Sequence, residues 1–211
     1  LYLRRTLMLE DTNHTSLVGV VFGAGSAGAM LIRYMVESYI SGRKSRARKK
    51  HIDGLKRITN IYDELNQIIA ADSNINRVMV IRSSNSGSIP SPGCRIFIRV
   101  LHEAYRSLSD SIIHSNLWDE RQADQHYISL VREVAQEGYV ELTAAELPEE
   151  SALRSVYDAS HTERAKVWRL ELTGTEMFYL SVNYRKDIEI PPISKAVTAN
   201  SVANLKSLFQ A

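Results

Sequence analysis

Residues 15–32, TSLVGVVFGAGSAGAMLI, contain no charged side chain. A helix that crosses a bilayer needs about 20 mostly apolar residues. The tyrosines at positions 34 and 39 suit an aqueous boundary, so the helix can extend to Ile40. We therefore expect one transmembrane helix over residues 15–40, after a short N-terminal tail over residues 1–14.

Small side chains recur every four residues in this run, at Gly19, Gly23 and Ala27. In lipid, small residues at that spacing let two helix backbones approach closely. The spacing indicates a helix–helix interface and therefore a homo-oligomer. The alternative, a glycine-rich anchor that faces only lipid, stays open.

A basic collar follows the apolar run. It consists of Arg43, Lys44, Arg46, Arg48, Lys49 and Lys50. Positive charge beside a transmembrane helix favours the cytoplasmic side, so we expect a single-pass protein with a cytoplasmic C-terminal domain. The collar is expected to bind anionic headgroups of the lipid bilayer. Nucleic acid is a less favoured partner, because no aromatic residue interrupts the basic run.

The glycines of the apolar run permit another interpretation. Gly23, Gly25 and Gly28 spell G-x-G-x-x-G, the pattern of a dinucleotide-binding turn. That site also needs a second strand and an acidic ribose ligand about 20 residues further on. The chain is basic there, so a dinucleotide-binding enzyme is only a remote alternative.

The rest of the chain predicts an α+β fold. Residues 51–72 carry an apolar stripe at helical spacing, which indicates a stalk helix or a helix packed on the domain's own sheet. With the collar this segment spans 41–72, and a globular domain fills 73–211. Within the domain we expect strands at 77–82, 95–105 and 139–142, a loop at 83–93, helices at 124–137, 150–158 and 194–209, and a hairpin of strands 165–172 and 177–184.

This order of elements resembles that of GAF domains. RVMVIRSSNSG, the later hairpin AKVWRLEL and MFYLSVNY, and the closing helix carry the resemblance, over about residues 55–211. GAF and PAS domains are small sensory modules, often joined to membrane anchors by helical stalks. The resemblance implies a ligand cavity between sheet and loops, with Asn85 and Gly87 in the loop on the pocket side. A weaker resemblance is to the single-span holins of T-even-like phages, which implies a phage membrane or virion component.

Side chains for catalysis are sparse. The six histidines lack metal-ligand spacing, and Cys94 is the only cysteine. We expect no catalytic residue, no metal site and no cofactor. The expected function is a membrane-anchored, non-catalytic GAF-like sensory or protein-interaction module, which acts as a homo-oligomer and has a protein partner as one possible receiver of its signal.

Overall fold

The computed structural model describes residues 26–85, 96–113 and 121–210. The chain divides into two compact units, residues 1–55 and residues 56–211. Gly19, Gly23 and Gly87 lie outside the described residues, and so does most of the uncharged run. The helix–helix interface predicted on Gly19, Gly23 and Ala27 therefore stays a prediction.

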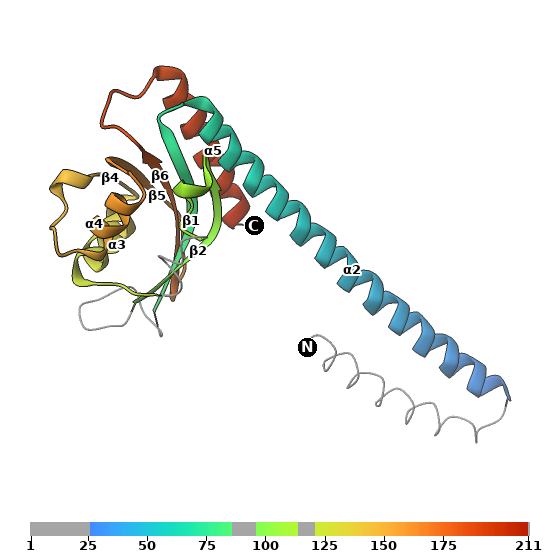
Figure 1. Cartoon of the computed structure of the whole chain (residues 1–211). Coiled ribbons are helices and arrows are strands. Elements are labelled where there is room, and N and C mark those ends of the chain that lie inside the picture. The colour runs from blue at the N-terminus through green and yellow to red at the C-terminus, as the bar shows by residue number, and fades with distance from the viewer. Residues whose placement is uncertain (1–25, 86–95, 114–120, 211) are drawn as a thin grey trace. The chain divides into compact units, whose positions relative to one another are not determined.

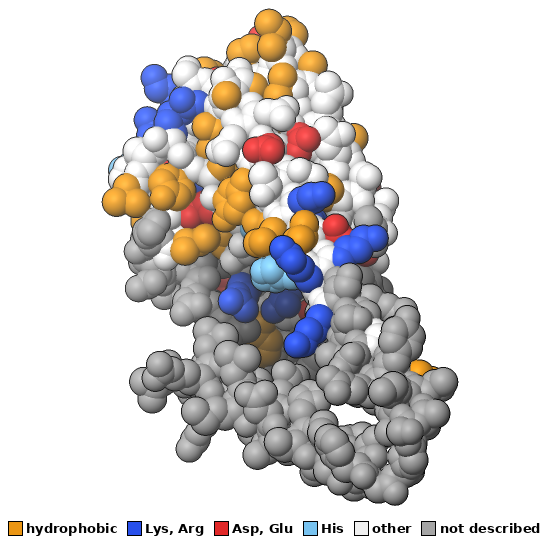
Figure 2. All heavy atoms as spheres, turned by 90° about the vertical axis from the view of Figure 1, so that its right-hand side faces the viewer, with side chains coloured by type: hydrophobic (Ala, Val, Ile, Leu, Met, Phe, Trp, Pro, Cys, Tyr) orange, Lys and Arg blue, Asp and Glu red, His pale blue; other side chains and the backbone are white. Residues whose placement is uncertain are grey.

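In the first unit, the described residues belong to helix α2, Ser26–Ala71. This helix contains Ala27 and the whole basic collar. The side chains of Arg43, Lys44, Arg48, Lys49 and Lys50 are exposed. Figure 2 shows Lys and Arg side chains in blue on the face turned toward the viewer, interspersed with hydrophobic side chains in orange and acidic ones in red. Among the described residues, no helix combines the length and the apolar character that a bilayer crossing requires. The predicted anchor thus has no support from the described part of the chain.

In the second unit, α2 packs against the domain's own sheet. Ile61, Leu65 and Ile68 are at most 2% exposed and belong to one hydrophobic cluster. The predicted stripe was Ile52, Leu55, Ile58, Tyr62, Leu65 and Ile69, and it matches this face only at Leu65, since Ile58 is 43% exposed and Tyr62 is 38% exposed. The buried face therefore uses Ile61 and Ile68, each one position before a residue of the predicted stripe.

The second unit is built on one antiparallel sheet. The strand order is β3-β2-β1-β6-β5-β4, and every described strand pair is antiparallel. The strands are β1 (Ile75–Asn85), β2 (Ile96–Tyr105), β3 (Arg121–Gln122), β4 (Tyr139–Thr143), β5 (Arg164–Leu172) and β6 (Glu176–Tyr184). A dinucleotide-binding fold needs parallel βαβ units, so the described chain contradicts that remote alternative. Gly28 lies inside α2 and not in a turn after a strand.

Helices cover both faces of the sheet. Figure 1 shows α3 (Gln125–Glu137) and α4 (Ala152–Ala159) on one side and α5 (Pro192–Gln210) on the other. Short 3-10 turns, Leu108–Asp110 and Ala144–Glu146, complete the connections. The core is accordingly split into two clusters, one between the sheet and α3–α4 and one between the sheet and the α2–α5 pair.

The termini of α3 follow from two residues that the sequence marks. Asp124 is the N-cap, and its Oδ1 accepts a hydrogen bond from the backbone N–H of Tyr127 at 2.7 Å. Gly138 ends the helix with φ 76°, a left-handed conformation that glycine adopts without steric cost. The predicted boundaries of this helix are therefore confirmed.

Candidate functional site

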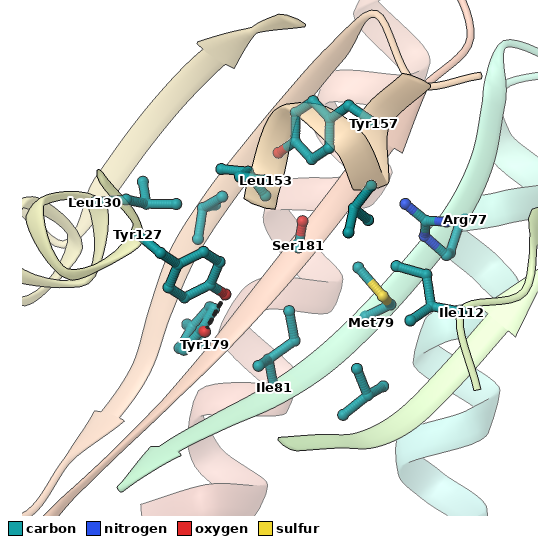
Figure 3. A pocket seen from close by; sticks show the side chains of 13 residues that line it. Arg77, Met79, Ile81, Ile112, Tyr127, Leu130, Leu153, Tyr157, Tyr179 and Ser181 are labelled. Carbon is teal, nitrogen blue, oxygen red and sulfur yellow. Dashed lines mark hydrogen bonds between the residues drawn. The ribbon is translucent and has the colours of Figure 1, made fainter. Parts of the chain in front are cut away.

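A small cavity lies between the sheet and helices α3 and α4. Its volume is ≈ 20 Å³, about the space that one water molecule requires. Apolar side chains from both layers form most of the lining (Figure 3). The polar atoms in the lining come from Arg77, Tyr127, Tyr157, Tyr179 and Ser181. Any ligand larger than water must therefore move the helices or the loops away from the sheet.

Two phenols meet on one side of this cavity. The hydroxyl groups of Tyr127, from α3, and Tyr179, from β6, form a buried hydrogen bond of 2.5 Å. Burial raises the pKa of both phenols, and it also raises the pKa of Tyr157, from α4. All three groups are therefore neutral at physiological pH and can donate or accept a hydrogen bond.

A buried cation lies across the cavity from this tyrosine pair (Figure 3). Arg77, from β1, is fully shielded from solvent. Its Nη1 donates to the Asp110 carbonyl at 2.8 Å, and its Nη2 donates to the hydroxyls of Ser160 at 3.2 Å and Thr162 at 3.4 Å. These acceptors are all neutral, and Nε is buried with no hydrogen-bond partner.

The nearest carboxylates are engaged elsewhere. Glu103 accepts hydrogen bonds from the Ser111 hydroxyl at 2.6 Å and from the backbone N–H of Ile112 at 2.7 Å. Asp110 forms an ion pair with Arg185 at 2.9 Å. Among the described residues, no carboxylate oxygen lies within 4.0 Å of the Arg77 guanidinium. Burial lowers the pKa of Arg77 to about 10, so the group still carries its charge at neutral pH.

The alternating direction of side chains along β1 explains which of its residues line the cavity. Successive side chains of a strand point to opposite faces. Arg77, Met79 and Ile81 therefore face α3–α4 and line the cavity, while Val78 and Val80 belong to the cluster beneath α2 and α5. An arginine at an inward position of an apolar strand is costly unless it has partners. That placement makes Arg77 a candidate ligand-binding residue.

The two loop residues that were predicted to bind a ligand stay untested. Asn85 is the last residue of β1, four positions beyond Ile81, and nothing is described of its side chain. Gly87 lies outside the described residues, so the assignment of both to a ligand site stays a prediction. The sequence predicted the β1 strand and the buried position of Tyr127. The one sequence signal for Arg77 is that it is a charged residue within the apolar run RVMVIR. Whether its side chain points inward depends on the strand register.

The described residues hold no candidate metal centre. Among residues 26–85, 96–113 and 121–210, no three His, Cys, Asp or Glu side chains cluster in a way that could hold an ion. His102 packs edge-on against Tyr62, with ring centroids 5.4 Å apart, as a half-buried polar side chain.

Comparison with known proteins adds structural neighbours only. No protein-family model matches the chain, and no curated protein matches it. A solved structure of GAF3 from Slr1393 of Synechocystis sp. PCC6803, in its photoproduct state, is similar with a TM-score of 0.49 and 8% identity, covering 73% of this chain and 94% of that one. A GAF domain/HD domain protein from Geobacter sulfurreducens is similar with a TM-score of 0.49 and 6% identity, covering 72% and 90%.

A third neighbour is the GAF domain of a two-component sensor histidine kinase from Bacillus halodurans. It has a TM-score of 0.44 and 11% identity, and the match covers 74% of this chain and 97% of that one. Each of these three solved structures is named as a GAF domain or as a protein that contains one.

Proposed function

We propose that residues 56–211 form a sensory domain of the GAF type, which binds a small molecule between the sheet and helices α3 and α4. The ligand has an apolar body and one anionic group. Its anionic group pairs with Arg77, and a polar atom elsewhere in the ligand contacts the Tyr127–Tyr179 pair. The domain is a receiver of a signal and not an enzyme.

The observation that carries this proposal is the unpaired buried guanidinium of Arg77. A charge in an apolar interior is unfavourable unless an opposite charge and hydrogen bonds compensate for it. Arg77 has three neutral acceptors and a free Nε. A carboxylate or a similar anion would supply the acceptor that Nε lacks and an opposite charge in direct contact, which Glu103 and Asp110 supply only at longer range.

Strand β1 offers a route from the cavity to the rest of the protein. Its residues on one face line the cavity, and its residues on the other face pack beneath α2 and α5. A ligand that displaces Met79 or Ile81 therefore shifts the backbone that carries Val78 and Val80. Packed interiors transmit such shifts because they contain little empty space.

The proposal for the whole protein is that α2 passes this shift to a partner. We expect a transmembrane anchor over residues 15–40, homo-oligomers assembled through Gly19, Gly23 and Ala27, and a collar held at the cytoplasmic membrane surface. Continuity of α2 from Ser26 to Ala71 supports a mechanical link between these parts, since one helix joins them.

Thermal unfolding in the presence of benzoate tests the ligand site. Benzoate combines an aromatic ring with a carboxylate, and benzyl alcohol is its neutral counterpart. We expect benzoate to raise the midpoint of unfolding more than benzyl alcohol does, and we expect Arg77→Met to abolish the difference. The matched control is Arg132→Met, which removes an exposed positive charge from α3.

The two controls separate a specific site from a general charge effect. If Arg132→Met weakens the benzoate effect as much as Arg77→Met does, the carboxylate binds through long-range attraction and the proposed site is wrong. If benzoate and benzyl alcohol stabilise the wild-type protein equally, the anionic group has no partner in the cavity.

A further inference from the structure

The opposite face of the sheet carries two arginines that the cavity does not use, and a third lies on α2. Val78 and Val80 face the α2–α5 side, so the alternation of β1 places Arg82 on that side too. The strand register places Arg99, on β2, directly opposite Arg82. Like charges that face each other across two strands are destabilising. An anion beside Arg82 and Arg99 would offset this repulsion.

The existing compensation is incomplete. Arg82 forms an ion pair with Glu176 at 3.5 Å, but its Nε is buried with no hydrogen-bond partner. Arg99 is exposed. Among the described residues, neither Arg99 nor Arg57 of α2 has a carboxylate within 4.0 Å. Among the described residues, Glu176 is thus the one carboxylate within 4.0 Å of any of the three guanidinium groups, which leaves the positive charges of two of them without an ion pair.

Arg57 belongs to the same neighbourhood through a chain of ring contacts. Its guanidinium lies 5.4 Å from the ring centroid of Phe209, on α5. The Phe209 ring lies 5.2 Å from that of Phe178, and Phe178 is the cross-strand partner of Arg82 on β6. The rings of Phe209 and Phe178 thus form an apolar surface between Arg57 and Arg82.

His102 lies on the same face of the sheet as Arg82 and Arg99. It lies opposite Val80 on β2 and so shares the face of Arg82 and Arg99. Burial lowers the pKa of His102, and the positive charge of Arg57 lowers it further, which places Arg57 within electrostatic reach. A bound anion would oppose both influences and raise that pKa.

We propose that Arg57, Arg82, Arg99 and His102 form a binding site for a phosphoryl group. A phosphate near neutral pH carries up to two negative charges, which match the two positive charges without an ion pair, and guanidinium groups bind its oxygens in pairs. The group can belong to a soluble phosphate or to a lipid headgroup, because the three arginines recognise the same oxyanion in both. The site is separate from the cavity, since the sheet lies between them.

Nuclear magnetic resonance of the full chain tests the site with inorganic phosphate. We expect phosphate to shift the His102 imidazole resonances in a saturable way and to raise the pKa of His102. Arg57→Gln and Arg99→Gln change exposed side chains and leave the partly buried Arg82 in place. Each should weaken phosphate binding about tenfold, the effect of losing one charge-assisted hydrogen bond. The matched control, Arg132→Gln, removes the same charge from the other side of the sheet and should change the affinity less than about twofold.

Vesicles distinguish the two sources of the phosphoryl group. The probes are vesicles of phosphatidylcholine with phosphatidic acid, compared with vesicles of phosphatidylcholine with phosphatidylserine. The basic collar attracts both, so the readout is the difference between Arg99→Gln and Arg132→Gln. A loss confined to Arg99→Gln with phosphatidic acid identifies a lipid headgroup. Site-dependent binding of inorganic phosphate without that loss identifies a soluble phosphate. If neither probe depends on Arg57 and Arg99 more than on Arg132, the proposal is overturned.

Discussion

Replacing Arg77 by methionine should not lower the free energy of unfolding of the domain, although the Arg77 side chain is completely buried. Methionine keeps the unbranched apolar stem and removes the charge. Most substitutions of buried residues destabilise a protein, so this expectation separates Arg77 from its neighbours. It rests on the idea that the guanidinium is present for a ligand and not for the fold.

The magnitude follows from the two states of the guanidinium. Burial lowers the pKa of Arg77 to about 10, a shift that corresponds to about 3 kcal/mol against the charged form in the folded state. Removing the charge recovers that cost. The substitution also leaves the Asp110 carbonyl without its donor, at a cost of about 1–3 kcal/mol. The Ser160 and Thr162 hydroxyls lose less, because they hydrogen-bond to each other at 3.1 Å. We expect a net change between zero and about 2 kcal/mol of stabilisation.

Urea unfolding followed by circular dichroism measures this change. Arg185→Met is the contrasting variant, because Arg185 forms the ion pair with buried Asp110. Its loss leaves a buried carboxylate without its counter-charge and should destabilise the domain by about 1–3 kcal/mol. If Arg77→Met destabilises the domain as strongly as Arg185→Met, then Arg77 is a structural residue and the argument for an anionic ligand fails.

Three other predictions concern the same domain. Burial raises the pKa values of Tyr127, Tyr157 and Tyr179 in the folded state. The contribution of these phenols to the free energy of unfolding is therefore fully present below about pH 10 and is lost as the pH rises, by up to about 1.4 kcal/mol per pH unit for each phenol. Unfolding free energies at increasing alkaline pH should show this decline, and a slope that Tyr127→Phe leaves unchanged would contradict it. Asp124→Ala removes the α3 cap and the acceptor of the Ala152 backbone N–H, at 2.7 Å, and should cost about 1–2 kcal/mol in urea unfolding; an unchanged midpoint would refute the capping role. Gly138→Ala forces a side chain into the left-handed region and should cost about 1 kcal/mol, whereas Gly138→Asn should cost less; equal losses for both variants would refute the conformational explanation.

Much of the second unit could be predicted from local patterns. The cap, the apolar face and the terminal glycine of helix 124–137 are all encoded by residues within or next to the helix, and the structure contains all three. The hairpin of β5 and β6 was also evident, because two β-rich runs flank a short turn with a glycine. These features depend on neighbours within one element, and a single sequence contains that information.

The face of α5 shows where local patterns mislead. By hydrophobicity alone, the buried face of α5 would consist of Val197, Val202, Leu205, Leu208 and Phe209. The structure instead buries Ser194, Thr198 and Ser201 beside three of those residues. Small side chains at these positions allow a close approach of the helix to the sheet, and hydrophobicity alone gives them no weight.

The candidate site could not be predicted, because it combines distant residues. The Tyr127–Tyr179 hydrogen bond joins positions 52 residues apart. The inward direction of Arg77 depends on the register of β1 against β6, where the pairing shifts between Ile75 and Arg77. A one-residue change in register moves every side chain of a strand to the opposite face. Sequence patterns therefore found the strand but not which of its residues would meet a ligand.

The central claim, a ligand site between the sheet and α3–α4, is tested most directly by methyl resonances of the methionines. Met79 lines the cavity, and Met177 is buried in the same cluster without lining it. In the wild-type chain, benzoate should produce a saturable shift of the Met79 methyl resonance and a smaller shift of the Met177 resonance, and Arg77→Met should abolish the Met79 response. A Met79 resonance that stays unchanged while benzoate binds elsewhere on the domain would contradict the account.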